Sequence, residues 1–304
     1  MKRLIRRTPC LDVAVTLAVL FCFSGSQADE PPTMASVIEL SSPSDWRPLD
    51  QRNLMYMKLA GRQIVFELAP QFAPRHIENL RKLVAQQYFD GLAIIRSQDN
   101  YVVQWGDPKF GEADSRSYGE AASTLAPEFF RDSAGLEFTK LDSRDAYADE
   151  VGFVDGFPAG RDGKRAWLAH CYGMLGVGRA NEPDSGNAAE LYVVTGHAPR
   201  HLDRNVTLIG RVLVGVEHLS SLSRGTGPLG FYDKEEQYVT IESIRFGSDL
   251  PAAERQHLEA LRTNTQTFDK FVDARRNRRE EWFVDPAGRV GLCNVPLPVR
   301  TVTR

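Results

Sequence analysis

Residues 64–108 decide the fold, and they read IVFELAPQFAPRHIENLRKLVAQQYFDGLAIIRSQDNYVVQWGDP. The stretch opens with a strand-like run that places Ile64 and Phe66 on one face. Just before it, residues 54–59 form another strand-like run, and Gly61 marks a turn between the two. The sequence therefore predicts a β-hairpin at this point.

A helix and two more strands follow within the same stretch. Pro74 suits a first helical turn, where a missing backbone N–H costs nothing. Three apolar residues then recur at helical spacing: Ile77, Leu80 and Val84. Residues 92–95 and 101–105 are predicted to form strands, and the turn signal of Asp90 and Gly91 precedes them.

The chain beyond this stretch alternates between an irregular segment and short apolar runs. Residues 109–165 hold many Gly, Asp, Arg and Ser residues and few apolar runs, which predicts a long insertion. Residues 215–222 suit a short helix. Strand-like runs return at 167–170, 174–177, 191–195, 206–209, 212–214 and 238–244. Many short strands with few helices predict a mainly β protein, a barrel or a sandwich.

Both ends of the chain differ from this pattern. Residues 29–53 are rich in Pro, Ser and Asp without a period, so they are predicted to be a linker. A helix is predicted from Pro251, with one stripe formed by Leu258, Leu261, Thr265, Phe268 and Val272. The last residues hold several prolines and are expected to pack as an extended arm. Residues 249–304 are therefore predicted to form a C-terminal helix and arm.

Residues 1–28 have the pattern of a cleaved secretory signal peptide. Basic residues open the chain, an apolar run covers residues 13–23, and small residues suit cleavage after Ala28. The apolar run is shorter than the roughly 20 residues that a membrane-spanning helix needs. The alternatives are a lipoprotein signal at Cys22, which the bulky Phe21 disfavours, and an uncleaved membrane anchor. We expect a periplasmic location.

Composition and charge exclude some classes of partner. With 42% hydrophobic and 25% charged residues, the chain has ordinary globular composition. Loss of residues 1–28 removes four basic residues and one acidic residue, which moves the formal charge from −3 to −6. A mildly acidic mature chain has no electrostatic reason to bind nucleic acid or an anionic membrane. The sequence leaves the oligomeric state open.

Two cysteines, Cys171 and Cys293, remain after the signal peptide takes Cys10 and Cys22 with it. In an oxidising compartment such a pair allows one disulfide, which would tie the C-terminal arm to the core. Two buried free thiols are the alternative at this point.

Short motifs recur in a fixed order between residues 54 and 248. They are AP at 73–74, NL at 79–80, YFDGL at 88–92, Arg96, QWGDP at 104–108, GMLGVG at 173–178, ELYV at 190–193, LD at 202–203 and GRV at 210–212. This series resembles the cyclophilin family of peptidyl-prolyl cis-trans isomerases. The family separates its arginine from its glutamine by seven residues, and Arg96 and Gln104 match that spacing.

The resemblance implies a fold, a site and a substrate. The fold is an eight-stranded antiparallel β-barrel with two capping helices, and the site is a groove on the barrel's outer face. Arg96 would be the catalytic arginine and Gln104 its partner. The proline pocket and its rim would be lined by Tyr101, Val102, Gly178, Tyr192, His201 and Leu202. The substrates would be proline-containing polypeptides, and no cofactor is implied.

The sequence departs from the family pattern at several positions in this groove. Residues 94–95 are both isoleucine where the family has Phe-His, and Val102 replaces a methionine. The other changes are Tyr192 for phenylalanine, Val206 for histidine and His201 for an aromatic residue. These changes support an alternative, a catalytically weak cyclophilin-like module that binds proline-containing segments as a chaperone or assembly factor.

The residue types fit the chemistry of X–Pro isomerisation. Amide resonance sets a barrier of roughly 18–20 kcal/mol, and the prolyl nitrogen gains a lone pair as the bond twists. A guanidinium is always charged, planar and rich in N–H donors, so it can stabilise the twisted state more than the planar one. An isolated arginine at a strand end is usually a solvated surface residue. Gln104 at the matching spacing favours a catalytic role for Arg96.

A metal site is not expected. His197 and His201 form an H-x-x-x-H pattern, but Pro199 lies between them and interrupts any helix. The glutamate of a zinc-binding H-E-x-x-H motif is also missing.

Overall fold

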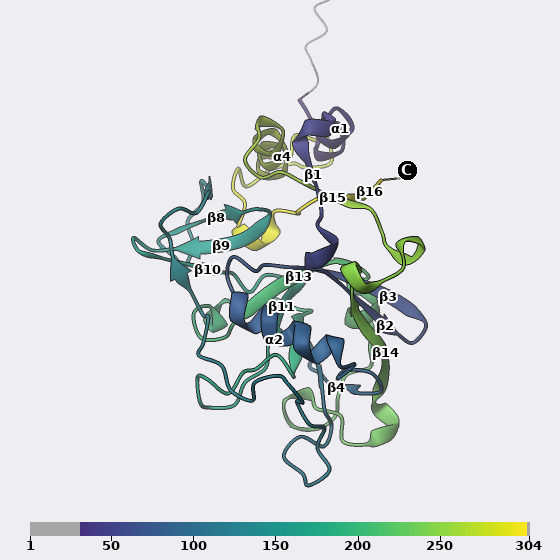
Figure 1. The fold of residues 1–304 in the computed structure, drawn as a ribbon. Helices are drawn as coiled ribbons and strands as arrows, with labels where there is room; N and C mark the ends of the chain where they lie inside the picture. Colours follow the sequence, from purple (N-terminus) through teal and green to yellow (C-terminus); the bar gives the residue numbers. More distant parts are fainter. Residues whose placement is uncertain (1–30, 303–304) are drawn as a thin grey trace, which may run out of the picture. The chain divides into compact units, whose positions relative to one another are not determined.

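Eight antiparallel strands close into a barrel in the order β11-β12-β5-β4-β14-β2-β3-β13 (Figure 1). The computed structural model describes residues 31–302, and a compact unit begins at Pro32. The barrel strands are β2 (Leu54–Leu59), β3 (Arg62–Leu68), β4 (Ala93–Ser97), β5 (Val102–Gly106), β11 (Met174–Val177), β12 (Leu191–Val194), β13 (Leu208–Val214) and β14 (Val239–Phe246). The expected eight-stranded barrel is confirmed.

The hairpin of β2 and β3 shows how local sequence directs the barrel. Leu59 pairs with Arg62, which leaves a two-residue turn. Both turn residues have positive φ, 49° at Ala60 and 70° at Gly61. Such a turn twists in the same sense as the strands, and glycine accepts this backbone conformation without strain. The predicted hairpin is therefore confirmed, with Ile64 and Phe66 buried in the barrel core.

Two helices contribute to the same core. Helix α2 (Pro74–Ala85) starts at the expected proline and buries one apolar face against the barrel. Helix α3 (Val216–Ser220) buries Leu219. Among residues 31–302, no helix is both long enough and apolar enough to span a membrane.

The long insertion has a sheet of its own, which the irregular sequence did not reveal. Its strand order is β6-β10-β9-β8-β7. The strands are β6 (Arg131–Asp132), β7 (Thr139–Leu141), β8 (Glu150–Val154), β9 (Phe157–Arg161) and β10 (Arg165–Leu168). The apolar run at 167–170, predicted as a returning strand, thus contributes β10 to the insertion and not to the barrel.

The two ends of the described chain meet in a third sheet. Strand β15 (Leu258–Leu261) lies between β1 (Trp46–Pro48) and β16 (Val299–Thr301). Helix α1 (Met34–Glu39) packs against helix α4 (Gln266–Asn277), and Figure 1 shows the two side by side.

Two predictions for these ends were wrong. The expected linker at 29–53 contains α1 and β1, because Thr33 and Ser36 form a capping box and Trp46 is only 3% exposed. The expected helix from Pro251 begins only after Thr265, whose side chain accepts a hydrogen bond from the Phe268 amide. The stretch before it pairs as strand β15 instead, because β1 and β16 satisfy its backbone groups.

A second hydrophobic core joins the N-terminal segment, the insertion and the C-terminal segment. We call it the second core; its buried members include Trp46, Leu141, Phe153, Phe268 and Leu292. The rings of Phe153 and Phe268 meet edge to face, with centroids 5.1 Å apart. Segments far apart in the chain therefore complete one apolar interior beside the barrel.

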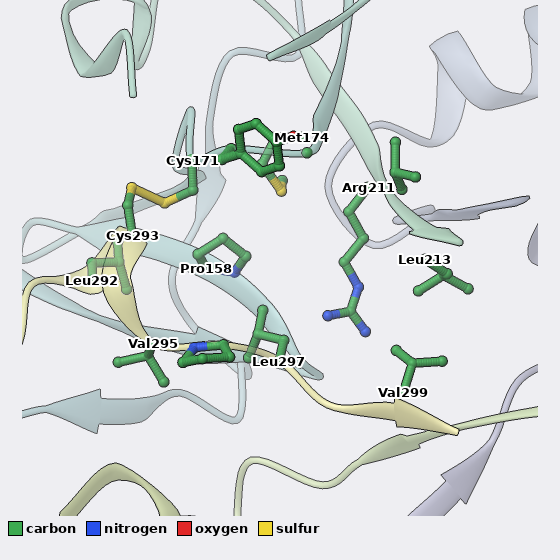
Figure 2. Close-up of a pocket in the computed structure, with 14 residues that line it drawn as sticks. Pro158, Cys171, Met174, Arg211, Leu213, Leu292, Cys293, Val295, Leu297 and Val299 are labelled. Carbon is green, nitrogen blue, oxygen red and sulfur yellow. A yellow bond between two sulfur atoms is a disulfide. The ribbon is translucent and has the colours of Figure 1, made fainter. Parts of the chain in front are cut away.

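Covalent and ionic contacts fasten the second core to the barrel. Cys171 and Cys293 form a disulfide, which links the residues before β11 to the C-terminal arm. The buried carboxylate of Glu67 on β3 binds Arg211 at 2.8 Å and Arg47 of β1 at 2.5 Å. A cavity of about 340 Å³ lies beside the disulfide, and Arg211 is among the lining residues drawn in Figure 2. That arginine, the one charged side chain lining this cavity, is already paired with Glu67.

Candidate active site

A β-bulge places Arg96 directly opposite Gln104. Strands β4 and β5 pair Ile94 with Trp105, and their register then shifts so that Arg96 faces Gln104. Regular alternation would have put Arg96 on the same face as the core residue Ile94. The extra residue, Ile95, turns the arginine to the outer face of the barrel, as bulges beside active sites commonly do.

Three acceptors hold the Arg96 guanidinium. Its Nε donates to the Leu229 carbonyl at 2.7 Å, one terminal nitrogen donates to Gln104 Oε1 at 3.1 Å, and the other donates to Gln98. Its central carbon also lies 5.6 Å and 5.2 Å from the ring centroids of Tyr101 and Phe231. A guanidinium has five N–H groups, so two have no partner among the described residues. Burial lowers the Arg96 pKa, but an arginine stays charged.

The loop that supplies the Leu229 carbonyl is strained. Leu229 has φ of 57°, a left-handed conformation that costs a non-glycine residue about 1–2 kcal/mol. Its side chain is 67% exposed, so packing of that side chain does not explain the strain. The conformation presents the carbonyl to Arg96, and it is part of what fixes the guanidinium.

Gln104 is oriented from both sides. Its Oε1 accepts from Arg96, and its Nε2 donates to Glu190 Oε2 at 2.8 Å. Arginine can only donate, so this arrangement fixes which end of the amide faces Arg96. Burial raises the pKa of the Glu190 carboxyl above its ordinary value.

These residues line a groove with a cavity of about 480 Å³. Seven of the eight predicted site residues meet there: Arg96, Gln104, Tyr101, Val102, Gly178, Tyr192 and Leu202. Val102, Tyr192 and Val194 form a small apolar cluster outside the barrel core, with Tyr101 and Val206 packed against it. The groove therefore combines an apolar floor with a few polar and charged side chains, Arg96 among them.

The eighth residue, His201, does not line the cavity. It is exposed and stacks on Tyr101, with ring centroids 6.2 Å apart and planes 11° from parallel. It supports the rim through Tyr101.

Sequence reasoning missed several residues of the groove: Phe110, Arg179, Glu190, Leu229 and Phe231. Phe110 is 61% exposed and belongs to the irregular insertion. Leu229 and Phe231 come from a glycine-rich loop without periodicity. Only Glu190 had a sequence signal, since it opens the ELYV motif.

Across residues 31–302, no group of three His, Cys, Asp or Glu side chains is placed to hold a metal ion.

Comparisons with known proteins agree with this geometry. The family model described as cyclophilin type peptidyl-prolyl cis-trans isomerase/CLD matches residues 54–246. The chain belongs to the cyclophilin-type peptidyl-prolyl cis-trans isomerase family.

Individual relatives are distant. A probable peptidyl-prolyl cis-trans isomerase of Brucella suis is 24% identical over 177 residues, which span 58% of this chain and 74% of that protein. A peptidyl-prolyl cis-trans isomerase-like 2 of Gibberella zeae is 26% identical over 159 residues, 52% of this chain and 21% of that protein. The crystal structure of cyclophilin AquaCyp293 from Hirschia baltica has a TM-score of 0.66 and 24% identity. The match covers 89% of this chain and 97% of the AquaCyp293 chain, so the similarity of fold extends beyond the barrel.

Proposed function

We propose that this chain isomerises X–Pro bonds in exported polypeptides, with Arg96 as the catalytic residue and Gln104 as its partner. The observation that carries the proposal is the bulge that sets Arg96 opposite Gln104 at the edge of an apolar groove. Val102, Tyr192 and Leu202 offer the apolar surface that a proline ring needs.

The mechanism follows from the two uncommitted N–H groups of Arg96. When the proline ring rests in the pocket, a donor from the guanidinium can reach the prolyl nitrogen as it becomes pyramidal. This hydrogen bond forms only in the twisted state, so it lowers the barrier rather than merely tightening binding. The Leu229 carbonyl, Gln98 and Gln104 hold the guanidinium in place beforehand. Gln104 keeps a second amide N–H for a peptide carbonyl.

A protease-coupled assay on a short X–Pro peptide tests these roles. We expect Arg96→Ala to lower kcat/KM about 100-fold, the usual loss when one preorganised donor is removed. Arg96→Lys should recover little, because an ammonium lacks the planar set of donors. The matched control is Arg245→Ala on β14, which pairs with Asp90 and does not line the groove. An inactive wild type that still binds the peptide would favour the alternative, a proline-binding chaperone module.

The proposed periplasmic location rests on the signal-like residues 1–28, which lie outside the described residues. The Cys171–Cys293 disulfide supports it, because such bonds persist in oxidising compartments. Cell fractionation with mass spectrometry of the mature chain tests it. A chain that starts at Asp29 in the periplasmic fraction is expected; an intact N-terminus in the cytoplasmic fraction would refute export.

A further inference from the structure

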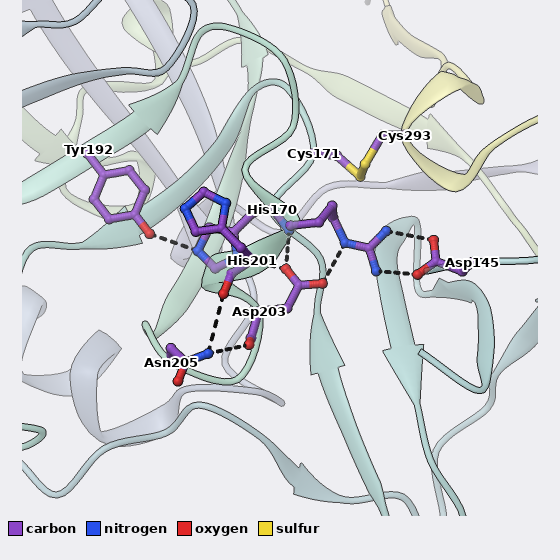
Figure 3. Close-up of polar contacts among 9 residues, drawn as sticks. Asp145, His170, Cys171, Tyr192, His201, Asp203, Asn205 and Cys293 are labelled. Atoms are coloured by element: carbon purple, nitrogen blue, oxygen red, sulfur yellow. Dashed lines mark hydrogen bonds and ion pairs between the residues drawn. A yellow bond between two sulfur atoms is a disulfide. The ribbon is translucent and has the colours of Figure 1, made fainter. Parts of the chain in front are cut away.

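The hydroxyl of Tyr192 points away from the groove and into the protein (Figure 3). Tyr192 is 6% exposed, and its ring lies in the wall of the proline pocket. The hydroxyl oxygen lies 2.9 Å from Nε2 of His170, a fully buried side chain. The two rings are nearly parallel, 10° apart, with centroids separated by 6.3 Å.

The strand beside Tyr192 is adapted to this placement. Gly176 on β11 pairs with Tyr192 on β12. A Cβ atom at position 176 would lie 2.2 Å from Tyr192 Cζ and 2.4 Å from its hydroxyl oxygen. Such contacts are sterically forbidden, so any larger residue at position 176 would displace the Tyr192 side chain. The position of the Tyr192 ring thus depends on Gly176, which leaves room for the ring, and on His170, which contacts the hydroxyl.

The other side of His170 is held by Asp203. Asp203 Oδ1 lies 2.9 Å from His170 Nδ1 and also accepts the His170 backbone N–H at 2.9 Å. Its second oxygen accepts from Arg200 Nε at 2.5 Å, and the far end of Arg200 binds both oxygens of Asp145. Figure 3 shows this chain of contacts running from the insertion to the groove.

The charges around His170 fix the direction of each hydrogen bond. Burial lowers the pKa of His170, and the positive charge of Arg200 acts in the same sense against the opposing pull of Asp203. Burial alone would raise the pKa of Asp203, but the His170 hydrogen bond and the Arg200 charge bring it below its ordinary value. With a neutral imidazole and an ionised carboxylate, Nδ1–H donates to Asp203. The lone pair on Nε2 is then left to accept the Tyr192 O–H.

We propose that His170 is a positioning residue of the proline pocket: it accepts the Tyr192 hydroxyl and so holds the ring in the groove wall, while Asp203 keeps His170 in the Nδ1–H tautomer. The proposal rests on the proposed function, since it concerns the pocket of the same groove. Without the acceptor, the hydroxyl is either buried without a partner or turns with its ring toward water in the groove. The first outcome costs free energy, and the second removes the surface on which the proline ring rests, so the pocket is weakened.

A double-mutant cycle separates positioning from simple destabilisation. We expect His170→Ala to weaken the affinity for a short proline peptide about tenfold, equivalent to about 1.4 kcal/mol. Tyr192→Phe alone should weaken it clearly less than His170→Ala does, because phenylalanine keeps the ring and needs no acceptor. The double variant should recover most of the affinity, although the cavity left by His170 remains. Equal affinities in His170→Ala and in the double variant would overturn the proposal.

Two further variants complete the experiment. His170→Gln places a polar group near the former Nε2 and should retain part of the affinity; it also serves if the alanine variant does not fold. Leu141→Ala, buried in the second core, should lower stability and leave peptide affinity unchanged. Because affinity is measured by titration, the result stands even if Arg96→Ala proves fully active and the catalytic proposal fails.

Imidazole ¹⁵N NMR on the unmodified protein tests the tautomer without any variant. We expect a neutral His170 protonated at Nδ1 near neutral pH, with a shifted Nε2 resonance in Tyr192→Phe. An Nε2-protonated or doubly protonated ring would contradict the proposal, since neither form can accept the tyrosine hydroxyl.

Discussion

The barrel core and the second core are both apolar, but the sequence encodes them in different ways. Three of the barrel's eight strand pairs join strands that are consecutive in the chain, as in the β2–β3 hairpin, where a two-residue turn sets the register. The second core forms only when the N-terminal segment, the insertion and the C-terminal segment meet. Contacts between distant segments, the Cys171–Cys293 disulfide among them, therefore hold it together. The comparison teaches that local sequence specifies single elements of the barrel, such as its hairpins, while the second core has no local counterpart.

Loss of a large side chain from each core should have the largest effect on stability, and it tests whether the groove depends on one core or on both. Phe66→Ala in the barrel and Phe153→Ala in the second core should each lower the free energy of unfolding by about 4 kcal/mol. Only Phe66 packs against Trp105, beside Gln104, with ring centroids 6.0 Å apart. We expect peptide affinity to fall in the Phe66 variant alone, measured by urea denaturation and titration. Equal losses of affinity would show that the groove depends on both cores.

Removal of the Glu67 carboxylate should have the next largest effect. Glu67→Gln leaves the buried guanidinium of Arg211 and the partly exposed guanidinium of Arg47 without this carboxylate, and we expect a loss of about 3 kcal/mol in urea denaturation. The exposed pair of Arg52 and Asp50 is the matched control, and Asp50→Asn should cost less than about 1 kcal/mol. Similar losses in both variants would contradict a special role for the buried cluster.

The disulfide should matter for stability and not for catalysis. Cys171 and Cys293 close a loop across 122 positions, so replacement of both by alanine should cost about 3 kcal/mol. The isomerase rate of the folded variant should stay close to that of the wild type, since neither cysteine lines the groove. A large drop in rate with stability unchanged would contradict the claim that the disulfide contributes to stability and not to catalysis.

The smallest expected effect is a pH dependence from His170. Its pKa in the folded chain lies below the ordinary value of 6.5, because burial disfavours the charged form. As the pH falls below 6.5, the unfolded chain binds a proton that the folded chain resists, so stability is lost on acidification. Stability should therefore be lower at pH 5.5 than at pH 7.5, and His170→Gln should lack this loss. Identical pH profiles for the two proteins would remove His170 as the cause.

The sequence predicted the barrel well because its signals are local. Alternating strands, a proline at a helix start and a glycine turn each act within a few residues. The second core offered no such signal: Trp46 looked like part of a polar linker, and Leu261, with which it pairs, looked like part of a helical stripe. Their true neighbours lie some two hundred residues away, where no periodic pattern reaches.

The site was predictable in its members and not in its geometry. Simple alternation puts Arg96 on the face of Ile94, and only the bulge at Ile95 brings it opposite Gln104. The motif spacing located the pair without giving a physical reason for it. Leu229 was out of reach, because its contribution is a backbone carbonyl from a distant loop.

The most direct test of the central claim is the rate of X–Pro isomerisation by Arg96→Ala, measured beside the wild type and Arg245→Ala with folding checked by circular dichroism. If the Arg96 guanidinium stabilises the twisted bond, this variant loses about 100-fold in kcat/KM while Arg245→Ala stays within about twofold of the wild type. A folded Arg96→Ala variant that isomerises the peptide at the wild-type rate would contradict the account.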